Sequence, residues 1–140
     1  MSDGETRVRE SFAKQAFMTL LGAQLTRVAP GEVDVELQFR DDLVQQHGYL
    51  HAGVTTAIAD SACGYAAMTL MPEGRDVLSV EFKVNLLAPA TGAAVVARAS
   101  VLRAGRTITV CRATVFAVGT DGSEKPVLEM QGTMMSVPLP

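Results

Sequence analysis

The chain has 140 residues, of which 48% are hydrophobic and 19% charged, and its net charge at pH 7 is −3. This length and composition suit one folded domain spanning residues 1–140, and the negative charge argues against nucleic-acid binding. No stretch is apolar enough to span a membrane, and the N-terminus lacks the apolar segment of a signal peptide, so a cytoplasmic location is expected.

The N-terminal part of the chain predicts one helix followed by two strands. Apolar residues recur at helical spacing over residues 7–21, and Gly22 is a suitable end for that helix. The residues that carry this spacing are Phe12, Ala16, Phe17, Leu20 and Leu21. Strands are expected at residues 23–28 and, after a Pro-Gly turn, at residues 33–39, where apolar and polar side chains alternate.

Residues 53–70 are rich in alanine and apolar almost all round, which is typical of a helix enclosed by other structure. Alternating patterns predict further strands at residues 79–86, 94–103, 107–118 and 127–137. Turn signals at Ala104-Gly105 and Asp121-Gly122 make hairpins of the last three. The order predicts an α+β domain in which a long central helix is wrapped by a curved antiparallel sheet of five or six strands.

One carboxylate stands out within the predicted central helix. Asp60 is the only Asp, Glu, Lys or Arg between Asp42 and Glu73. A carboxylate in apolar surroundings loses solvation unless it is paired, so a reactive role is the favoured interpretation. The alternative is that Asp60 faces a solvent gap or caps nearby backbone.

The glycine-containing loop over residues 45–53 leads to the start of the same helix. Backbone N–H groups there lack intrahelical partners, so the N–H of Ala52 or Gly53 could polarise a carbonyl as in an oxyanion hole. Ala52 and Asp60 are eight residues apart, which is about 12 Å along a helix. They cannot reach one carbonyl together, so a shared site in a two-fold dimer is expected.

Other reactive side chains give weaker signals. His47 and His51 have the i, i+4 spacing of metal ligands, but they precede the helix and lack a third ligand, so no metal site is predicted. A Cys63–His51 nucleophile pair has no support from spacing. Cys63 and Cys111 are expected to be reduced core residues.

Together these residues resemble the phenylacetate-degradation-type (PaaI-like) acyl-CoA thioesterases of the hotdog superfamily. The resemblance rests on His51-Ala52-Gly53, on Asp60 nine residues after the histidine, on Ala62-Cys63-Gly64 and on Gly105-Arg106-Thr107. It implies a hotdog fold and makes Asp60 the nucleophile or general base, with the Ala52 N–H as the carbonyl donor. It places Gln45 and His51 beside the thioester and Ser79 beside the attacking water. Coenzyme A would be part of the substrate, not a cofactor, with Arg103 and Arg106 as candidates for its phosphates.

The predicted function is therefore hydrolysis of an acyl-CoA, and few aromatic residues favour a medium or long aliphatic acyl chain. The predicted assembly is a homodimer with shared active sites, and two dimers could pair into a tetramer. Two alternatives stay open. One is a hotdog enoyl-CoA hydratase or dehydratase that uses His51 and Asp60 for proton transfer. The other is a non-catalytic acyl-CoA-binding module.

Overall fold

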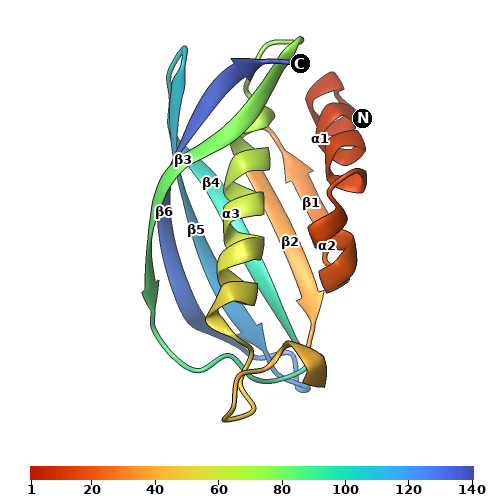
Figure 1. The fold of residues 1–140 in the computed structure, drawn as a ribbon, viewed down its shortest axis with the longest axis vertical. Helices are drawn as coiled ribbons and strands as arrows, with labels where there is room; N and C mark the ends of the chain where they lie inside the picture. Colours follow the sequence, from red (N-terminus) through yellow and green to blue (C-terminus); the bar gives the residue numbers. More distant parts are fainter.

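The computed structural model describes residues 1–140, and its centre is one helix enclosed by a sheet. Helix α3 (Ala52–Met68) lies in the concave face of a curved, six-stranded antiparallel sheet (Figure 1). The strands are β1 (Gln24–Ala29), β2 (Glu32–Gln38), β3 (Arg75–Leu86), β4 (Ala94–Ala104), β5 (Ile108–Val118) and β6 (Glu124–Pro138). Their order is β1-β2-β4-β5-β6-β3. The predicted α+β hotdog arrangement is confirmed, although β3 and β6 begin earlier than the alternation indicates.

Helix α3 is apolar all round because it packs on several strands at once. Eleven of its 17 residues are buried, and many of these are alanines, which let the helix approach the sheet closely. Fully buried aliphatic and methionine side chains fill the space between them, including Val33, Val35, Leu37, Ile58, Val95, Val115, Leu128, Met130 and Met134. Cys63 and Cys111 belong to the same core, as predicted.

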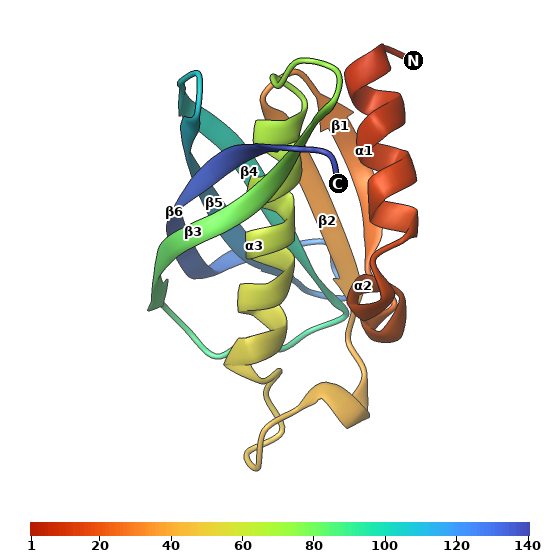
Figure 2. The same ribbon diagram turned by 45° about the horizontal axis from the view of Figure 1, so that its top comes forward.

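The single N-terminal helix predicted over residues 7–21 is wrong. The structure has α1 (Asp3–Ala13) and α2 (Ala16–Leu21), separated at Gln15, whose backbone is extended with φ −82° and ψ 97°. The break changes the phase of α2, so Met18 is buried while Phe17 and Leu20 are 51% and 68% exposed. Both helices lie beside α3 and β1 (Figure 2). The helix pair therefore covers α3 on the flank that the sheet leaves open.

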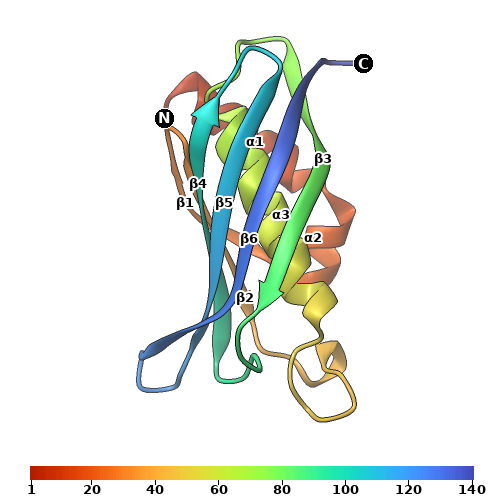
Figure 3. The ribbon, with the colours of Figure 1, turned by 90° about the vertical axis from the view of Figure 1, so that its left-hand side faces the viewer.

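Strand β3 forms one edge of the sheet, next to β6 (Figure 3). Its pairing with β6 shifts between Ser79 and Glu81, which leaves Val80 as a β-bulge. Ser79 therefore faces the helix side with Met134, whereas Glu81 bonds Thr133 on the outer face. The unbroken alternation predicted from residue 79 onward is thus wrong, because the bulge reverses the faces within the strand.

Candidate active site

The side chain of Asp60 meets strand β3 halfway along α3. Ser79 Oγ donates a hydrogen bond of 2.6 Å to Asp60 Oδ1, and this contact depends on the bulge that turns Ser79 toward the helix. Ser79 Oγ also lies 3.3 Å from Met134 Sδ. A hydroxyl has one hydrogen, and the charged oxygen at the shorter distance takes it. The bond fixes the half-buried carboxylate and leaves its second oxygen free of side-chain partners.

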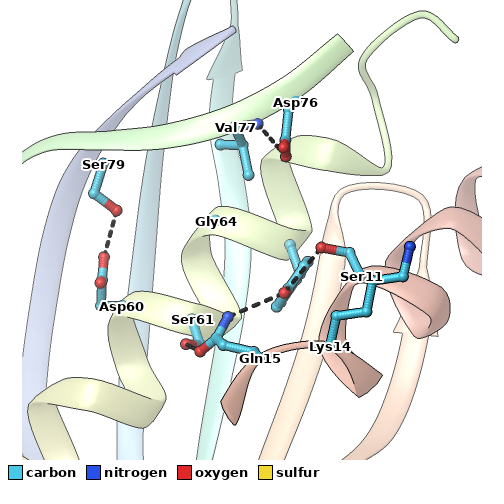
Figure 4. Close-up of a pocket in the computed structure, with 10 residues that line it drawn as sticks. Ser11, Lys14, Gln15, Asp60, Ser61, Gly64, Asp76, Val77 and Ser79 are labelled. Carbon is cyan, nitrogen blue, oxygen red and sulfur yellow. Dashed lines mark hydrogen bonds between the residues drawn. The ribbon is translucent and has the colours of Figure 1, made fainter. Parts of the chain in front are cut away.

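The free side of Asp60 opens on a cavity of about 400 Å³, here called the acid cavity (Figure 4). It lies between α3, β3 and the joint between α1 and α2. The residues that line it are Ser11, Lys14, Gln15, Asp60, Ser61, Gly64, Tyr65, Asp76, Val77 and Ser79. The half-buried Asp60 carboxylate thus borders a cleft that a small molecule could enter.

The loop before α3 is held by two side chains that the sequence singled out. Gln45 Oε1 accepts hydrogen bonds from the backbone N–H groups of His47 and Tyr49, at 2.6 and 3.3 Å. The Gln45 amide NH₂ is therefore the part left for a ligand. His51 is the N-cap of α3, and its Nδ1 accepts a bond of 2.8 Å from the Gly53 N–H. The neutral ring then carries its proton on Nε2, which is a donor.

The backbone N–H groups of Ala52 and Gly53, both predicted as donors, differ in whether they are already hydrogen-bonded within the chain. The Gly53 N–H is occupied by His51, and a Cβ at position 53 would lie 3.0 Å from that ring nitrogen, so glycine serves the cap. The Ala52 N–H has no hydrogen-bond partner in the chain. Ala52 is thus the donor available to a carbonyl oxygen.

Ala52 lines a second cavity, of about 550 Å³, here called the helix-start cavity. Its lining is Gln45, Tyr49, Leu50, His51, Ala52, Thr55, Leu86, Leu87, Ala88, Pro89, Ala90 and Val127. It shares no residue with the acid cavity. Within the chain, the carboxylate and the unpaired N–H therefore line separate cavities, about 12 Å apart along α3.

Comparison with known proteins identifies the family. Residues 47–123, which include the start of α3, Asp60 and Ser79, match the model of the thioesterase superfamily. The chain belongs to the thioesterase superfamily. It is accordingly a thioester hydrolase of this family.

Relatives of this thioesterase agree in fold over nearly all of its length. A thioesterase family protein from Silicibacter pomeroyi is 46% identical, with a TM-score of 0.94 over 97% of this chain and 99% of that one. The PaaI protein of Escherichia coli is 18% identical with a TM-score of 0.84, covering 96% and 93%, and so shares the fold. A 1,4-dihydroxy-2-naphthoyl-CoA hydrolase from Listeria monocytogenes is 28% identical over 75% of this chain and 82% of its own length.

Two other groups of predicted residues lie apart from both cavities. Arg103 and Arg106 are exposed on the hairpin between β4 and β5, at the opposite end of α3 from the loop over residues 45–51 (Figure 1). Neither arginine lines the acid or helix-start cavity of its own protomer.

The cysteines and the histidine pair offer no separate chemistry here. Burial raises the pKa of the Cys111 thiol to about 12 and that of Cys63 further, so neither forms a thiolate readily. Cys63 lies inside the core, far along α3 from His51. No third His, Cys, Asp or Glu joins His47 and His51 in a cluster.

Sequence reasoning missed most of the wall of the acid cavity. Ser11, Lys14 and Gln15 come from the N-terminal helices, outside residues 47–123 that match the thioesterase family. One signal was available: Ser61 is a polar residue directly beside Asp60 in a helix made mostly of apolar residues. The contacts of the N-terminal residues with α3 leave no such pattern in the sequence.

Proposed function

We propose that the protein hydrolyses acyl-CoA thioesters to a free acid and coenzyme A, in a site built from two subunits. Asp60 and Ser79 would come from one protomer, and the Ala52 N–H from α3 of its partner. The observation that carries the proposal is the division of these groups between two cavities. Two antiparallel α3 helices about a two-fold axis would bring each acid cavity against the partner's helix-start cavity.

In this arrangement the thioester carbonyl oxygen accepts a hydrogen bond from Ala52 of the partner subunit. The developing oxyanion is stabilised there by a donor that is already fixed, at the positive end of the helix. The free oxygen of Asp60 takes the proton of a water that attacks the carbonyl carbon, or attacks that carbon itself. In either route the C–S bond breaks, the sulfur leaves as the coenzyme A thiol after protonation, and water supplies the oxygen of the free acid.

Two further groups would hold the substrate beside the carbonyl. The Nε2–H of His51 and the NH₂ of Gln45 are donors. The other polar atom of each side chain, His51 Nδ1 and Gln45 Oε1, already accepts a hydrogen bond from a backbone N–H. Both lie in the helix-start cavity with Ala52. Phosphates of coenzyme A would reach the rim, where Arg103 and Arg106 are candidates for their binding.

The edge of the sheet supports the dimer. Strand β3 has no neighbour on its outer side, and its apolar residues Leu78, Val80 and Phe82 are 60%, 56% and 42% exposed. An unpaired apolar edge is normally covered, and pairing with the same strand of a second copy is one way to cover it. Dimers of this kind could pair again into a tetramer, which a mass measurement would reveal.

Coenzyme A as the carrier is supported by the relative from Listeria monocytogenes, whose name is that of an acyl-CoA hydrolase. The acyl group is less defined. The composition, with few aromatic residues, favours a medium or long aliphatic chain.

Asp60→Asn tests the proposal. It keeps the shape of the side chain and a bond to Ser79 but removes the base, so thiol release from an acyl-CoA should fall about 10²–10⁴-fold. Asp121→Asn, in the exposed turn between β5 and β6, is the matched control and should retain full activity. Undiminished hydrolysis by Asp60→Asn would refute the assignment.

Assays of the purified wild-type protein distinguish hydrolysis from the two alternative functions. A hydratase would change the absorbance of an enoyl-CoA without releasing thiol. An acyl-CoA-binding module would bind substrate and release nothing. Either result with the wild-type protein would replace hydrolysis as the proposed activity.

A further inference from the structure

Arg40 connects the end of α2 to the loop that leads into α3. Its Nη1 donates hydrogen bonds to the backbone carbonyls of Leu20 and Leu21, at 3.2 and 3.0 Å. These carbonyls lie in the last turn of α2, where a helix lacks partners for them and where its dipole favours a cation. The other side of the guanidinium forms a bidentate pair with Asp42, in which Nε lies 3.0 Å from Oδ1 and Nη2 2.9 Å from Oδ2. One side chain therefore holds both segments.

The space between α2 and the start of α3 is not filled by side chains. A cavity of about 570 Å³ lies there, and its lining is Phe17, Leu20, Leu21, Arg40, Asp42, Leu43, Val44, His51, Gly53 and Val54. Close packing fixes the distances between elements in a protein core, and this packing is incomplete beside the cavity. The connection through Arg40 and Asp42 therefore lies where packing constrains the start of α3 less than it does in the core.

The pair also determines where a backbone acceptor for His51 lies. Asp42 is the middle residue of η1 (Asp41–Leu43), a single turn of 3₁₀ helix, and the carbonyl of Leu43 accepts the His51 N–H at 3.0 Å. Two bonds within α3, to the His51 carbonyl and to its Nδ1, hold the other side of this residue. The unpaired N–H of Ala52 belongs to the next peptide bond. The position of η1 thus helps to set the direction in which that N–H points.

From these contacts we infer that Arg40 is a positioning residue: it holds η1 and thereby directs the Ala52 N–H at the thioester carbonyl. The inference rests on the proposed function, in which that N–H stabilises the developing oxyanion. Arg40 does not line the helix-start cavity, so it acts through the loop and not on the substrate. An oxyanion donor works at about 2.7–3.1 Å, so a shift of about 1 Å in the loop is enough to slow the reaction.

Arg40→Ala should lower kcat about tenfold, measured as thiol release from the fastest of hexanoyl-CoA, decanoyl-CoA and benzoyl-CoA. KM should change less than about twofold, because the weakened interaction is one made in the transition state. Arg98→Ala is the matched control and should keep wild-type kcat. Arg98 also forms a bidentate surface pair, with Glu124, and its side chain is 42% exposed against 39% for Arg40. Asp42→Ala breaks the same connection from its other end and should reproduce the loss, even if Arg40→Ala does not fold.

A mixed dimer distinguishes displacement of Ala52 from general damage to the chain. When Arg40→Ala pairs with Asp60→Asn, one site combines the intact Asp60 of the first chain with the intact Ala52 loop of the second, and the other site has neither. The isolated heterodimer should therefore reach about half of wild-type activity, about fivefold above the Arg40→Ala homodimer. If Arg40 supported the whole subunit, the site that retains Asp60 would be damaged as well, and the heterodimer would stay below that homodimer.

Amide hydrogen exchange followed by NMR reports on the loop without any need for activity. Arg40→Ala should speed exchange of the His51 amide about tenfold or more, because its bond to the Leu43 carbonyl opens more often. The amide of Ile58, a fully buried residue of α3, should exchange at the wild-type rate. A general loss of stability would speed exchange at both positions.

The outcomes separate this inference from the proposed function. Arg40→Ala activity within about twofold of wild type, a loss confined to KM, or unchanged exchange at His51 overturns the positioning role and leaves hydrolysis by Asp60 standing. So does a heterodimer no more active than the Arg40→Ala homodimer, provided that Asp60→Asn paired with Ala52→Pro does recover activity. If that second heterodimer is inactive, the shared site fails and the inference fails with it. An absence of thiol release by the wild-type protein from all acyl-CoAs overturns the proposed activity itself.

Discussion

Two variants that are each inactive should restore activity when they form a mixed dimer. Asp60→Asn removes the carboxylate, and Ala52→Pro removes the N–H that has no partner. Proline suits position 52, which is the first residue of α3. His51 before it already has φ −60° and ψ 139°, the extended conformation that a residue preceding proline prefers. The second variant thus replaces the N–H hydrogen with the proline ring and should leave the fold intact.

The expected recovery of activity follows from the proposed division of each active site between two subunits. Equal amounts mixed at random give half of all dimers as heterodimers. Each heterodimer has one site with both Asp60 and the Ala52 N–H and one site with neither, where wild type has two complete sites. The mixture should therefore show about a quarter of wild-type activity, whereas each variant alone should be at least about 10²-fold down.

The assay is thiol release after the two variants, each with a different tag, are co-expressed and the doubly tagged dimers are isolated. The isolated heterodimers should show about half of wild-type activity, because one of their two sites is complete. Ala52→Gly keeps the N–H and is the control, expected to be close to wild type. If isolated heterodimers are no more active than the two parents, the site is not shared between subunits, and the pairing of Asp60 with Ala52 must be abandoned.

Three further predictions concern the folded protein. Ile58→Ala, at a fully buried position of α3, should lower the free energy of unfolding by about 2–5 kcal/mol in urea titration. Iodoacetamide should label Cys63 and Cys111 only as fast as the protein unfolds, since both are 0% exposed; rapid labelling of the native protein would contradict this. Glu124→Gln should cost at most about 1 kcal/mol at pH 7. Arg98 holds the pKa of the Glu124 carboxyl below its usual range, so that stabilisation is present above the unfolded pKa and should vanish as the pH falls through the folded one.

The main elements of the fold could be predicted because each leaves a local pattern. Alternation marks β2, β4 and β5, and the apolar stretch marks α3. Two irregularities beside Asp60 could not be predicted. At the break, Gln15 bonds to Ser61 and Tyr65, which lie 46 and 50 residues away. The bulge at Val80 depends on pairing with β6, and a spacing pattern within one segment contains neither kind of information.

The candidate site, like the fold, could be predicted only in part. Asp60 was found because a lone charge in an apolar helix is visible in the sequence, and Ala52 because helix ends follow from helix geometry. The hydrogen bond from Ser79 to Asp60 could not be predicted, because the two residues are 19 positions apart and the contact depends on the bulge in β3. The sequence also could not show which backbone N–H is available as a donor. In the structure the Gly53 N–H is bonded to His51, whereas the Ala52 N–H is unpaired.

The two irregularities and the exposed edge of the sheet lead to one conclusion about how this thioesterase is organised. The bulge turns Ser79 toward Asp60 and leaves Val80 in the exposed apolar edge of β3. The helix break brings Gln15 onto α3, into the wall of the cavity that Asp60 faces. These two departures from regular structure both lie at the acid cavity, whereas the helix-start cavity is built around a regular N-cap. If β3 pairs across the dimer, then the strand that covers the edge also carries Ser79. Association and catalysis would then depend on the same residues, and dilution below the dimer dissociation constant should abolish activity before it unfolds the subunit.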